Sequence, residues 1–180
     1  MTTTRYLLTG RPGVGKTTLL RKIAAGLSGL SIGGFFTQEI RERGSRVGFR
    51  VETFDGQSGI LAHVDFISGP RVGKYGVDCN AFDRIGVQAL ERAVTEASVI
   101  FIDEIGKMEL FSNRFRSVLA SAFETRKPLV ATIMAHAHPL TDGLKRREDV
   151  LLTEVTPDNR DRLADEIVQT VRRSLQPCPP

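Results

Sequence analysis

The sequence has no tryptophan, only two tyrosines and only two cysteines among its 180 residues. With so few aromatic side chains it offers little for stacking the bases of a nucleic acid. The formal net charge of +4 suits anionic ligands, but the basic residues are scattered along the chain. Cys79 and Cys178 do not form a Cys-x-x-Cys pair, which argues against a metal site or a disulfide framework. We therefore do not expect a nucleic-acid partner.

Long hydrophobic runs are also absent. The apolar stretches fall far short of the roughly 20 residues that cross a bilayer. The first residues lack the apolar core and the cleavage site of a secretory signal. We expect no membrane partner and a cytoplasmic location. At about 150 residues per domain, the length predicts one domain over residues 1–176 and a short tail at residues 177–180.

Predicted strands and helices alternate along most of the chain. The run at residues 99–102 is apolar throughout, as in a strand that is buried on both faces of a parallel sheet. The alternation predicts an α/β fold with a mostly parallel central sheet and helices on both faces. The predicted strands are residues 5–8, 99–102, 129–133 and 150–155, and the predicted helices are residues 16–27, 82–97, 112–125 and 157–174, with a polar loop before the last strand.

Residues 33–64 follow a different pattern. They contain three short strand-like runs that are separated by turn residues such as Arg43-Gly44 and Asp55-Gly56. This pattern predicts a small antiparallel meander. The meander either extends the edge of the sheet or covers the ligand as a flap, and the sequence favours neither arrangement.

Residues 10–17 match the phosphate-loop pattern Gly-x-x-x-x-Gly-Lys-[Ser/Thr], between a predicted strand and a predicted helix. Backbone N–H groups of such a loop bind polyphosphate, and the N-terminus of the following helix attracts the anion. We expect Lys16 to contact the β and γ phosphates and the Thr17 hydroxyl to bind Mg²⁺. The predicted nucleotide-binding residues are Gly10, Arg11, Pro12, Gly13, Val14, Gly15, Lys16, Thr17 and Thr18.

An acidic pair, Asp103 and Glu104, follows the apolar strand at residues 99–102. Open α/β sheets bind their ligands at the carboxyl ends of the strands. We assign Asp103 to the Mg²⁺ shell and Glu104 to the positioning and deprotonation of the attacking water. The candidate catalytic residues are therefore Lys16 and Glu104, the candidate metal ligands are Thr17 and Asp103, and the predicted cofactor is Mg²⁺.

Weaker candidates surround this set. Thr132 could orient the water, although an ordinary strand threonine fits the position equally well. A second positive group is expected near the γ-phosphate, because charge builds up there in the transition state. The candidates are Arg11, Arg41, Arg43, Arg146 and Arg147. His136 and His138 have no cysteine or acidic partner nearby in the sequence, which argues against zinc.

Several segments resemble the small P-loop nucleoside-triphosphatases first described in thermophiles, whose vertebrate member is called cancer-related nucleoside-triphosphatase. The similarity extends from Gly10 to about Arg160. The segments that carry it are GRPGVGKTT from Gly10, GFFTQEIR from Gly34, VGKYGVD from Val72, DEIGKMEL from Asp103 and NRD from Asn159. The DEIGKMEL segment is the most diagnostic, because many kinases share the first one.

The resemblance implies a RecA-like core and Mg²⁺-dependent hydrolysis of ATP, GTP, CTP and UTP to nucleoside diphosphate and phosphate. It also implies broad base specificity and slow turnover. Asn159 and Arg160 are candidate base contacts, because they follow the last predicted strand. Gln38 stands where the family often carries an acid, and residues 135–140 do not follow a known family pattern.

Two alternatives remain open. The Pro12-Gly13 loop resembles that of nucleoside monophosphate kinases, and arginines of the meander could bind an acceptor phosphate. These arginines are Arg41, Arg43, Arg46 and Arg50. The other alternative is a nucleotide-gated binding module that hydrolyses little and signals to a protein partner. Glu104 favours hydrolysis, because a kinase has no use for a water-activating base beside the γ-phosphate.

Overall fold

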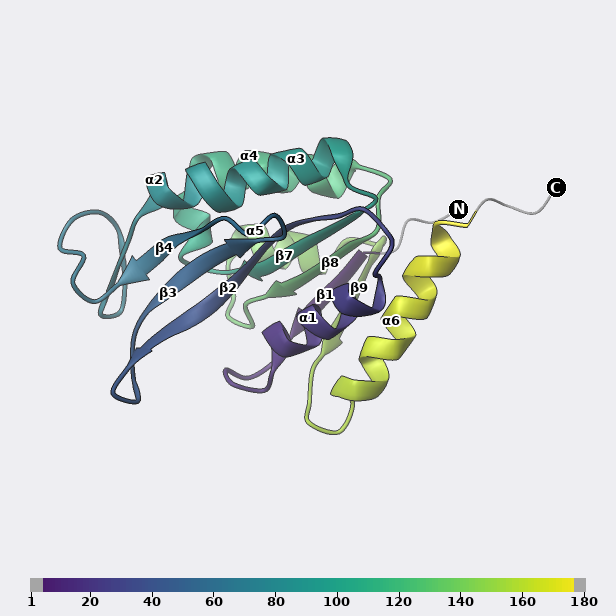
Figure 1. The fold of residues 1–180 in the computed structure, drawn as a ribbon, viewed down its shortest axis with the longest axis horizontal. Coiled ribbons are helices and arrows are strands. Elements are labelled where there is room, and N and C mark those ends of the chain that lie inside the picture. The colour runs from purple at the N-terminus through teal and green to yellow at the C-terminus, as the bar shows by residue number, and fades with distance from the viewer. Residues whose placement is uncertain (1–4, 177–180) are drawn as a thin grey trace.

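The computed structural model describes residues 5–176, which are arranged around one mixed β-sheet (Figure 1). The strand order is β5-β6-β4-β3-β2-β7-β8-β1-β9. Strands β2, β7, β8, β1 and β9 are parallel, and the strands on the other side of β2 pair in antiparallel fashion. The strands are β1 (Arg5–Thr9), β2 (Ile32–Glu42), β3 (Ser45–Thr53), β4 (Ser58–His63), β5 (Arg71–Val72), β6 (Tyr75–Val77), β7 (Val99–Ile105), β8 (Leu129–Ile133) and β9 (Val150–Glu154).

Helices cover both faces of the sheet, as the alternating pattern predicts (Figure 1). Helices α1 and α6 pack together on one face, and α3 and α4 pack together on the other. Because side chains alternate along a strand, Leu7 of β1 joins the core under α3 and α4, while Tyr6 and Leu8 join the core under α1 and α6. The helical segments are α1 (Lys16–Gly26), α2 (Cys79–Phe82), the π-helical η1 (Asp83–Val87), α3 (Gln88–Glu96), the 3₁₀ turn η2 (Glu109–Phe111), α4 (Asn113–Glu124), α5 (Pro139–Lys145) and α6 (Arg160–Ser174).

The prediction of a polar loop before the last strand is wrong in part, because this segment contains helix α5. Pro139 occupies the first turn of this helix, and the ring Nδ1 of His138 accepts a hydrogen bond from the N–H of Leu140 at 3.3 Å. Thr141 is the residue that α5 buries. No apolar stripe therefore marks the helix in the sequence.

The predicted meander forms β2, β3 and β4 and extends the main sheet. Phe35 of β2 lies opposite Thr53 of β3 on one side and Ile102 of β7 on the other. This pairing excludes a separate flap as a description of these strands. Arg43 and Gly44 form the turn between β2 and β3 with φ angles of 47° and 81°, a combination that suits a twisted hairpin.

Two further expectations concern the chain as a whole. Every helix within residues 5–176 is too short or too polar to cross a membrane. The tail predicted at residues 177–180 lies outside the described residues.

Candidate functional site

The segment between β1 and α1 is a glycine-rich loop that ends at the N-terminus of α1. Gly10, Gly13 and Gly15 have φ angles of 149°, 78° and 96°, which residues with a Cβ rarely adopt. Gly15 is the N-cap residue of α1. Because glycine has no side chain, Gly15 makes no side-chain capping hydrogen bond to the first turn of the helix. The first N–H groups of α1 and the positive end of its dipole are therefore available to an anion.

Lys16 curls back over this loop. Its Nζ donates hydrogen bonds to the carbonyl oxygen of Gly10 at 3.0 Å and to that of Arg11 at 3.4 Å. These contacts hold the ammonium group beside the loop glycines. The loop therefore presents a fixed positive charge together with its backbone N–H groups.

Asp103 and Glu104 lie on β7, which is separated from β1 by β8. The prediction that they follow the strand is wrong in this detail, because β7 continues to Ile105. The register between β7 and β8 shifts between Ile102 and Ile105, and an irregularity of this kind re-aims the side chains next to it. The peptide bond between Asp103 and Glu104 is cis. Since β1 and β7 run in the same direction, the acidic pair and the phosphate loop lie at the same edge of the sheet.

Asp103 is 2% exposed and has one carboxylate oxygen without a partner. Its Oδ1 accepts a hydrogen bond from Oγ1 of Thr132 at 2.6 Å, whereas the buried Oδ2 has no hydrogen-bond partner within residues 5–176. Burial raises the pKa of Asp103, while the hydrogen bond from Thr132, the nearby Thr17 hydroxyl and the charge of Lys16 lower it. A buried oxygen of this kind, close to a threonine hydroxyl, fits the oxygen ligands that Mg²⁺ prefers.

The donor set suits Mg²⁺ better than a metal caged by protein side chains. Within the described residues, no three or more His, Cys, Asp or Glu side chains form a group that could hold a metal ion. Mg²⁺ usually keeps several waters and binds substrate phosphates, so Thr17 and Asp103 are a sufficient protein contribution. Thr132 orients Asp103 with its hydroxyl, which places Thr132 behind the candidate ligand.

Glu104 lies partly buried beside Asp103. Burial raises the pKa of Glu104, the nearby Lys16 charge lowers it, and the Asp103 charge raises it again. A carboxylate with a raised pKa accepts a proton more readily than an ordinary one. Glu104 therefore places a carboxyl of raised pKa next to the candidate metal ligand Asp103.

The structure brings a third carboxyl to the site, which the sequence analysis missed. Glu109, on η2, is 5% exposed. A Cβ built on Gly106 would lie 2.9 Å from Oε2 of Glu109 and 3.6 Å from Cδ of Glu104. Burial, together with the charge of Glu104, raises the pKa of Glu109 to about 8. The sequence signal that could have indicated Glu109 is the DEIGKMEL segment. In this segment Gly106 lies between Glu104 and Glu109, and apolar residues lie next to both glutamates.

The raised pKa of Glu109 predicts a protein whose stability falls as the pH rises. The carboxyl ionises near pH 4.5 when unfolded, whereas the folded protein keeps the proton up to about pH 8. Between these values the unfolded state binds fewer protons, so the free energy of unfolding decreases with pH. The variant Glu109→Gln cannot ionise at this position, so its stability should lack this pH dependence. Relative to wild type, its free energy of unfolding should increase by a few kcal/mol between about pH 5 and about pH 8. Urea unfolding of wild type and Glu109→Gln at both pH values measures this difference in the free energy of unfolding. If the stabilities of the two proteins changed with pH in parallel, the prediction would be wrong.

Of the two residues suggested as base contacts, the structure brings Arg160 to the phosphate loop. A Cβ built on Gly15 would lie 2.7 Å from Nη1 of Arg160. The side chain of Asn159 is engaged in the turn before α6, because its Oδ1 accepts from the N–H of Thr156 at 2.9 Å and its Nδ2 donates to the carbonyl of Glu154 at 2.8 Å.

Several of the candidate arginines are bound to carboxylates. Arg41 lies on β2 beyond the part that pairs with β7, and its Nη2 is 2.6 Å from Oε2 of Glu39. Arg147 pairs with Asp149 and with Glu124. These contacts pair both guanidinium groups with carboxylates.

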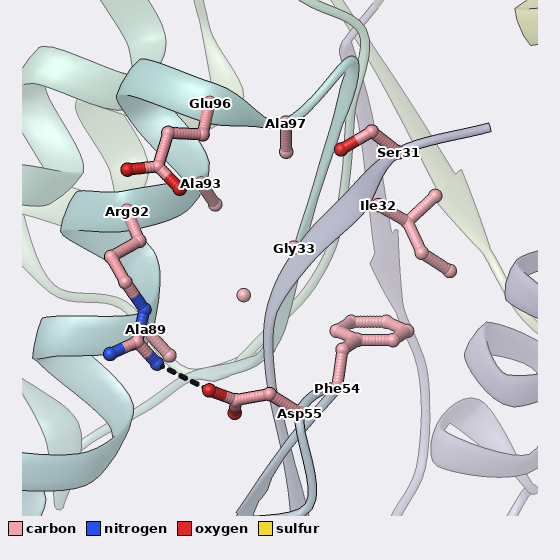
Figure 2. Close-up of a pocket in the computed structure, with 11 residues that line it drawn as sticks. Ser31, Ile32, Gly33, Phe54, Asp55, Ala89, Arg92, Ala93, Glu96 and Ala97 are labelled. Atoms are coloured by element: carbon pink, nitrogen blue, oxygen red, sulfur yellow. Dashed lines mark hydrogen bonds and ion pairs between the residues drawn. The ribbon is translucent and has the colours of Figure 1, made fainter.

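A cavity of about 320 Å³ lies elsewhere, between α3 and the first residues of β2 (Figure 2). The ion pair between Arg92 and Asp55, at 2.8 Å, closes one side of it. The cavity is lined by the start of β2, so it lies at the edge where the parallel strands begin. The phosphate loop lies at the opposite edge, and this cavity is not part of the candidate site.

The loop, the lysine and threonine at the start of α1, and a buried aspartate two strands away define a class of proteins. The class is the P-loop nucleotide-binding fold, in which backbone N–H groups and a helix N-terminus bind phosphates.

Comparison with known proteins identifies the family. A family model described as NTPase matches residues 5–168. The nucleoside-triphosphatase THEP1 of Thermotoga sp. (strain RQ2) is 47% identical over 168 residues, which cover 93% of this chain and 95% of that protein. The chain therefore belongs to this NTPase family, and the resemblance predicted from its motifs is confirmed.

Two solved structures share the fold. The crystal structure of THEP1 from the hyperthermophile Aquifex aeolicus superposes with a TM-score of 0.87 at 40% identity, covering 94% of this chain and 100% of that chain. The solution structure of a human cancer-related nucleoside triphosphatase superposes with a TM-score of 0.81 at 37% identity, covering 96% and 100%. These neighbours confirm the predicted P-loop, RecA-like fold class.

Proposed function

We propose that this chain hydrolyses nucleoside triphosphates, among them ATP, GTP, CTP and UTP, to nucleoside diphosphate and phosphate in a Mg²⁺-dependent reaction. The observation that carries the proposal is the carboxyl pair on β7. Within residues 5–176, Asp103 has a buried oxygen without a hydrogen-bond partner, Glu104 lies beside it, and the charge of Lys16 acts on both. Similar proteins are named nucleoside-triphosphatases, which supports hydrolysis of nucleoside triphosphates.

Each residue of the site has a task in this reaction. The backbone N–H groups of residues 10–18, except Pro12, which has none, would bind the phosphates, and Lys16 would stabilise the charge that develops on the γ-phosphoryl oxygens. Thr17 and Asp103 would hold Mg²⁺, which supplies further positive charge at the phosphoryl group. Glu104 accepts a proton from water as the water oxygen bonds to the γ-phosphorus. The bond to the bridging oxygen then breaks, and that oxygen leaves with the diphosphate.

Broad base specificity is part of the proposal. Asn159 uses its amide within the turn, so it has little capacity left to read the edge of a base. Arg160 lies beside Gly15 and presents a planar cation, which stacks on the face of any base. We therefore include Arg160 among the nucleotide-binding residues and describe Asn159 as a residue that shapes the turn.

Slow turnover is also part of the proposal. An arginine at the γ-phosphate accelerates phosphoryl transfer in related reactions by about 10³–10⁵. Arg41 and Arg147, two of the candidates for this role, are bound to carboxylates. The basal rate would then rely on Lys16, the metal ion and Glu104.

The kinase alternative loses support from the same contacts. Its acceptor phosphate would need free arginines on the meander, but Arg41 and Arg46 both pair with Glu39. Arg46 also donates to the hydroxyl of Tyr75 at 3.0 Å. A nucleotide-gated binding module would use the same nucleotide site but would hydrolyse little nucleotide. A measurement of phosphate release must therefore distinguish it from the enzyme.

The proposal includes the setting in which the enzyme works. We propose a single domain over residues 1–176 without a nucleic-acid partner, and a cytoplasmic location. The free thiol of Cys79 supports a reducing compartment.

The test is phosphate release from the four nucleotides with Mg²⁺ and with EDTA. We expect release from all four within about tenfold of one another, and complete loss with EDTA or with Lys16→Ala, because both remove positive charge from the phosphates. Arg160→Ala should raise KM for all four, because the stacking surface is lost. Release that requires an added acceptor would establish a kinase, and tight binding without release would establish a binding module.

A further inference from the structure

Glu109 is the acidic residue of the site that the proposed reaction does not use. It begins the 3₁₀ turn that follows β7, and the N–H of Ser112 donates to the carbonyl of Glu109 at 3.1 Å to close this turn. The turn places the Glu109 side chain at 5% exposure, next to the strand that carries Glu104. A carboxyl is costly to bury in ionised form unless a cation accompanies it.

No cation accompanies Glu109 among the described residues. It forms no ion pair there, and Lys16 acts on Asp103 and Glu104 but is not among the charges that act on Glu109. The nearby charges are those of Glu104 and Asp103, while the backbone N–H groups of Gly106 and Glu109 provide weak compensation. A third negative charge at this point would also repel a bound triphosphate. The neutral acid, which has an O–H donor, is the form that this environment accommodates.

Gly106 provides the space between the two glutamates. A Cβ on Gly106 would meet both side chains, at 2.9 Å from Oε2 of Glu109 and at 3.6 Å from Cγ and Cδ of Glu104. Gly106 is absent from the glycines with positive φ, so its backbone conformation does not require glycine. Oε2 of Glu109 and the end of the Glu104 side chain therefore both lie close to Gly106, at a spacing that one bridging water can span.

We propose that Glu109 is a positioning residue for Glu104: as a neutral acid it donates a hydrogen bond to the Glu104 carboxylate, directly or through one water molecule, and holds it toward the attacking water. This inference rests on the proposed function, because it takes Glu104 as the base. Glu109 itself touches neither substrate nor metal in this role. Its contribution appears in kcat and leaves nucleotide binding unchanged.

Two substitutions of Glu109 separate the donor from the charge. Glu109→Met has an unbranched side chain without a donor, and we expect kcat to fall about 10–100-fold, as for other groups that orient an active-site ligand. KM and the Kd for nucleotide should stay within about twofold. Glu109→Gln keeps a neutral donor of the same shape, so it should recover kcat to within about threefold of wild type. Glu96→Met, on the exposed end of α3, is the matched control and should leave kcat unchanged.

Gly106→Ala tests the same geometry without removing a carboxyl. The added Cβ would lie 2.9 Å from Oε2 of Glu109 and would displace that carboxyl, so we expect a loss of kcat comparable to that of Glu109→Met. This variant also keeps the inference testable if Glu109→Met fails to fold, which thermal melts of each variant detect.

The outcomes distinguish the inference from the function beneath it. If Glu109→Met and Gly106→Ala both keep wild-type kcat, the positioning role is wrong. If Glu109→Gln loses as much activity as Glu109→Met, a charged Glu109 is required and the neutral-donor role is wrong. If Glu104→Gln, measured alongside, keeps wild-type turnover, the proposed function itself fails.

Discussion

Replacement of Glu104 by glutamine is expected to lower the rate of phosphate release by about 10²–10⁴, which is the usual contribution of a general base. Glutamine has nearly the same shape as glutamate but cannot accept the proton of the attacking water. Glu104 lies beside Asp103 and interacts with the charge of Lys16. The substitution removes the proton acceptor but leaves the contact of Lys16 with the phosphate loop intact. Nucleotide affinity should therefore change little.

Single-turnover phosphate release and equilibrium nucleotide binding, measured on the same protein, separate these two effects. Glu148→Gln is the matched control, because Glu148 is exposed on the segment before β9. A Glu104→Gln variant that releases phosphate at the wild-type rate would exclude Glu104 as the base. A variant that also loses nucleotide binding would indicate that Glu104 contributes to the binding site instead.

Gly34→Ala is expected to cause the largest loss of stability, more than about 4 kcal/mol, which is a large part of the stability of an ordinary domain. A Cβ at Gly34 would lie 1.8 Å from the carbonyl oxygen of Phe101, and the φ angle of Gly34 is 117°. That oxygen belongs to the backbone of β7, at the centre of the parallel core. It cannot move away without disrupting the pairing of β2 with β7.

Gly56→Ala is the control that separates steric overlap from backbone strain. Gly56 also has a positive φ, of 84°, but a Cβ there would meet no atom within 4 Å. We expect this variant to lose only about 1 kcal/mol, from the unfavourable backbone conformation. Urea unfolding of the two variants measures the difference. If both variants lost the same free energy of unfolding, the steric overlap of a Cβ at Gly34 with Phe101 would add nothing to the backbone strain.

The parts of the site that are contiguous in sequence could be predicted without a structure. The loop glycines, Lys16 and Thr17 follow one another at the start of α1, so their spacing alone places them together. Asp103 and Glu104 were placed at the correct edge of the sheet, because the apolar strand before them is recognisable. The irregularity of β7 at this point could not be predicted, since it depends on the register with β8.

Contacts between distant segments escaped the sequence analysis for the same reason. Arg160 was suggested only by its place after the last strand, and its approach to Gly15 depends on how α6 packs beside α1. Glu109 was missed because an acidic residue in a short turn has no periodic pattern, and burial cannot be inferred for it from neighbouring residues.

By itself, the sequence determined the chemistry that neighbouring residues share: a phosphate-binding loop, a lysine, a threonine hydroxyl and an acidic pair after an apolar run. Only the tertiary structure decided that the meander continues the sheet and that Glu109 and Glu104 both lie close to Gly106. The physical reason is the range of the interactions. Backbone conformation and local spacing act between residues a few positions apart, whereas strand pairing and burial depend on surfaces that meet only in the folded chain.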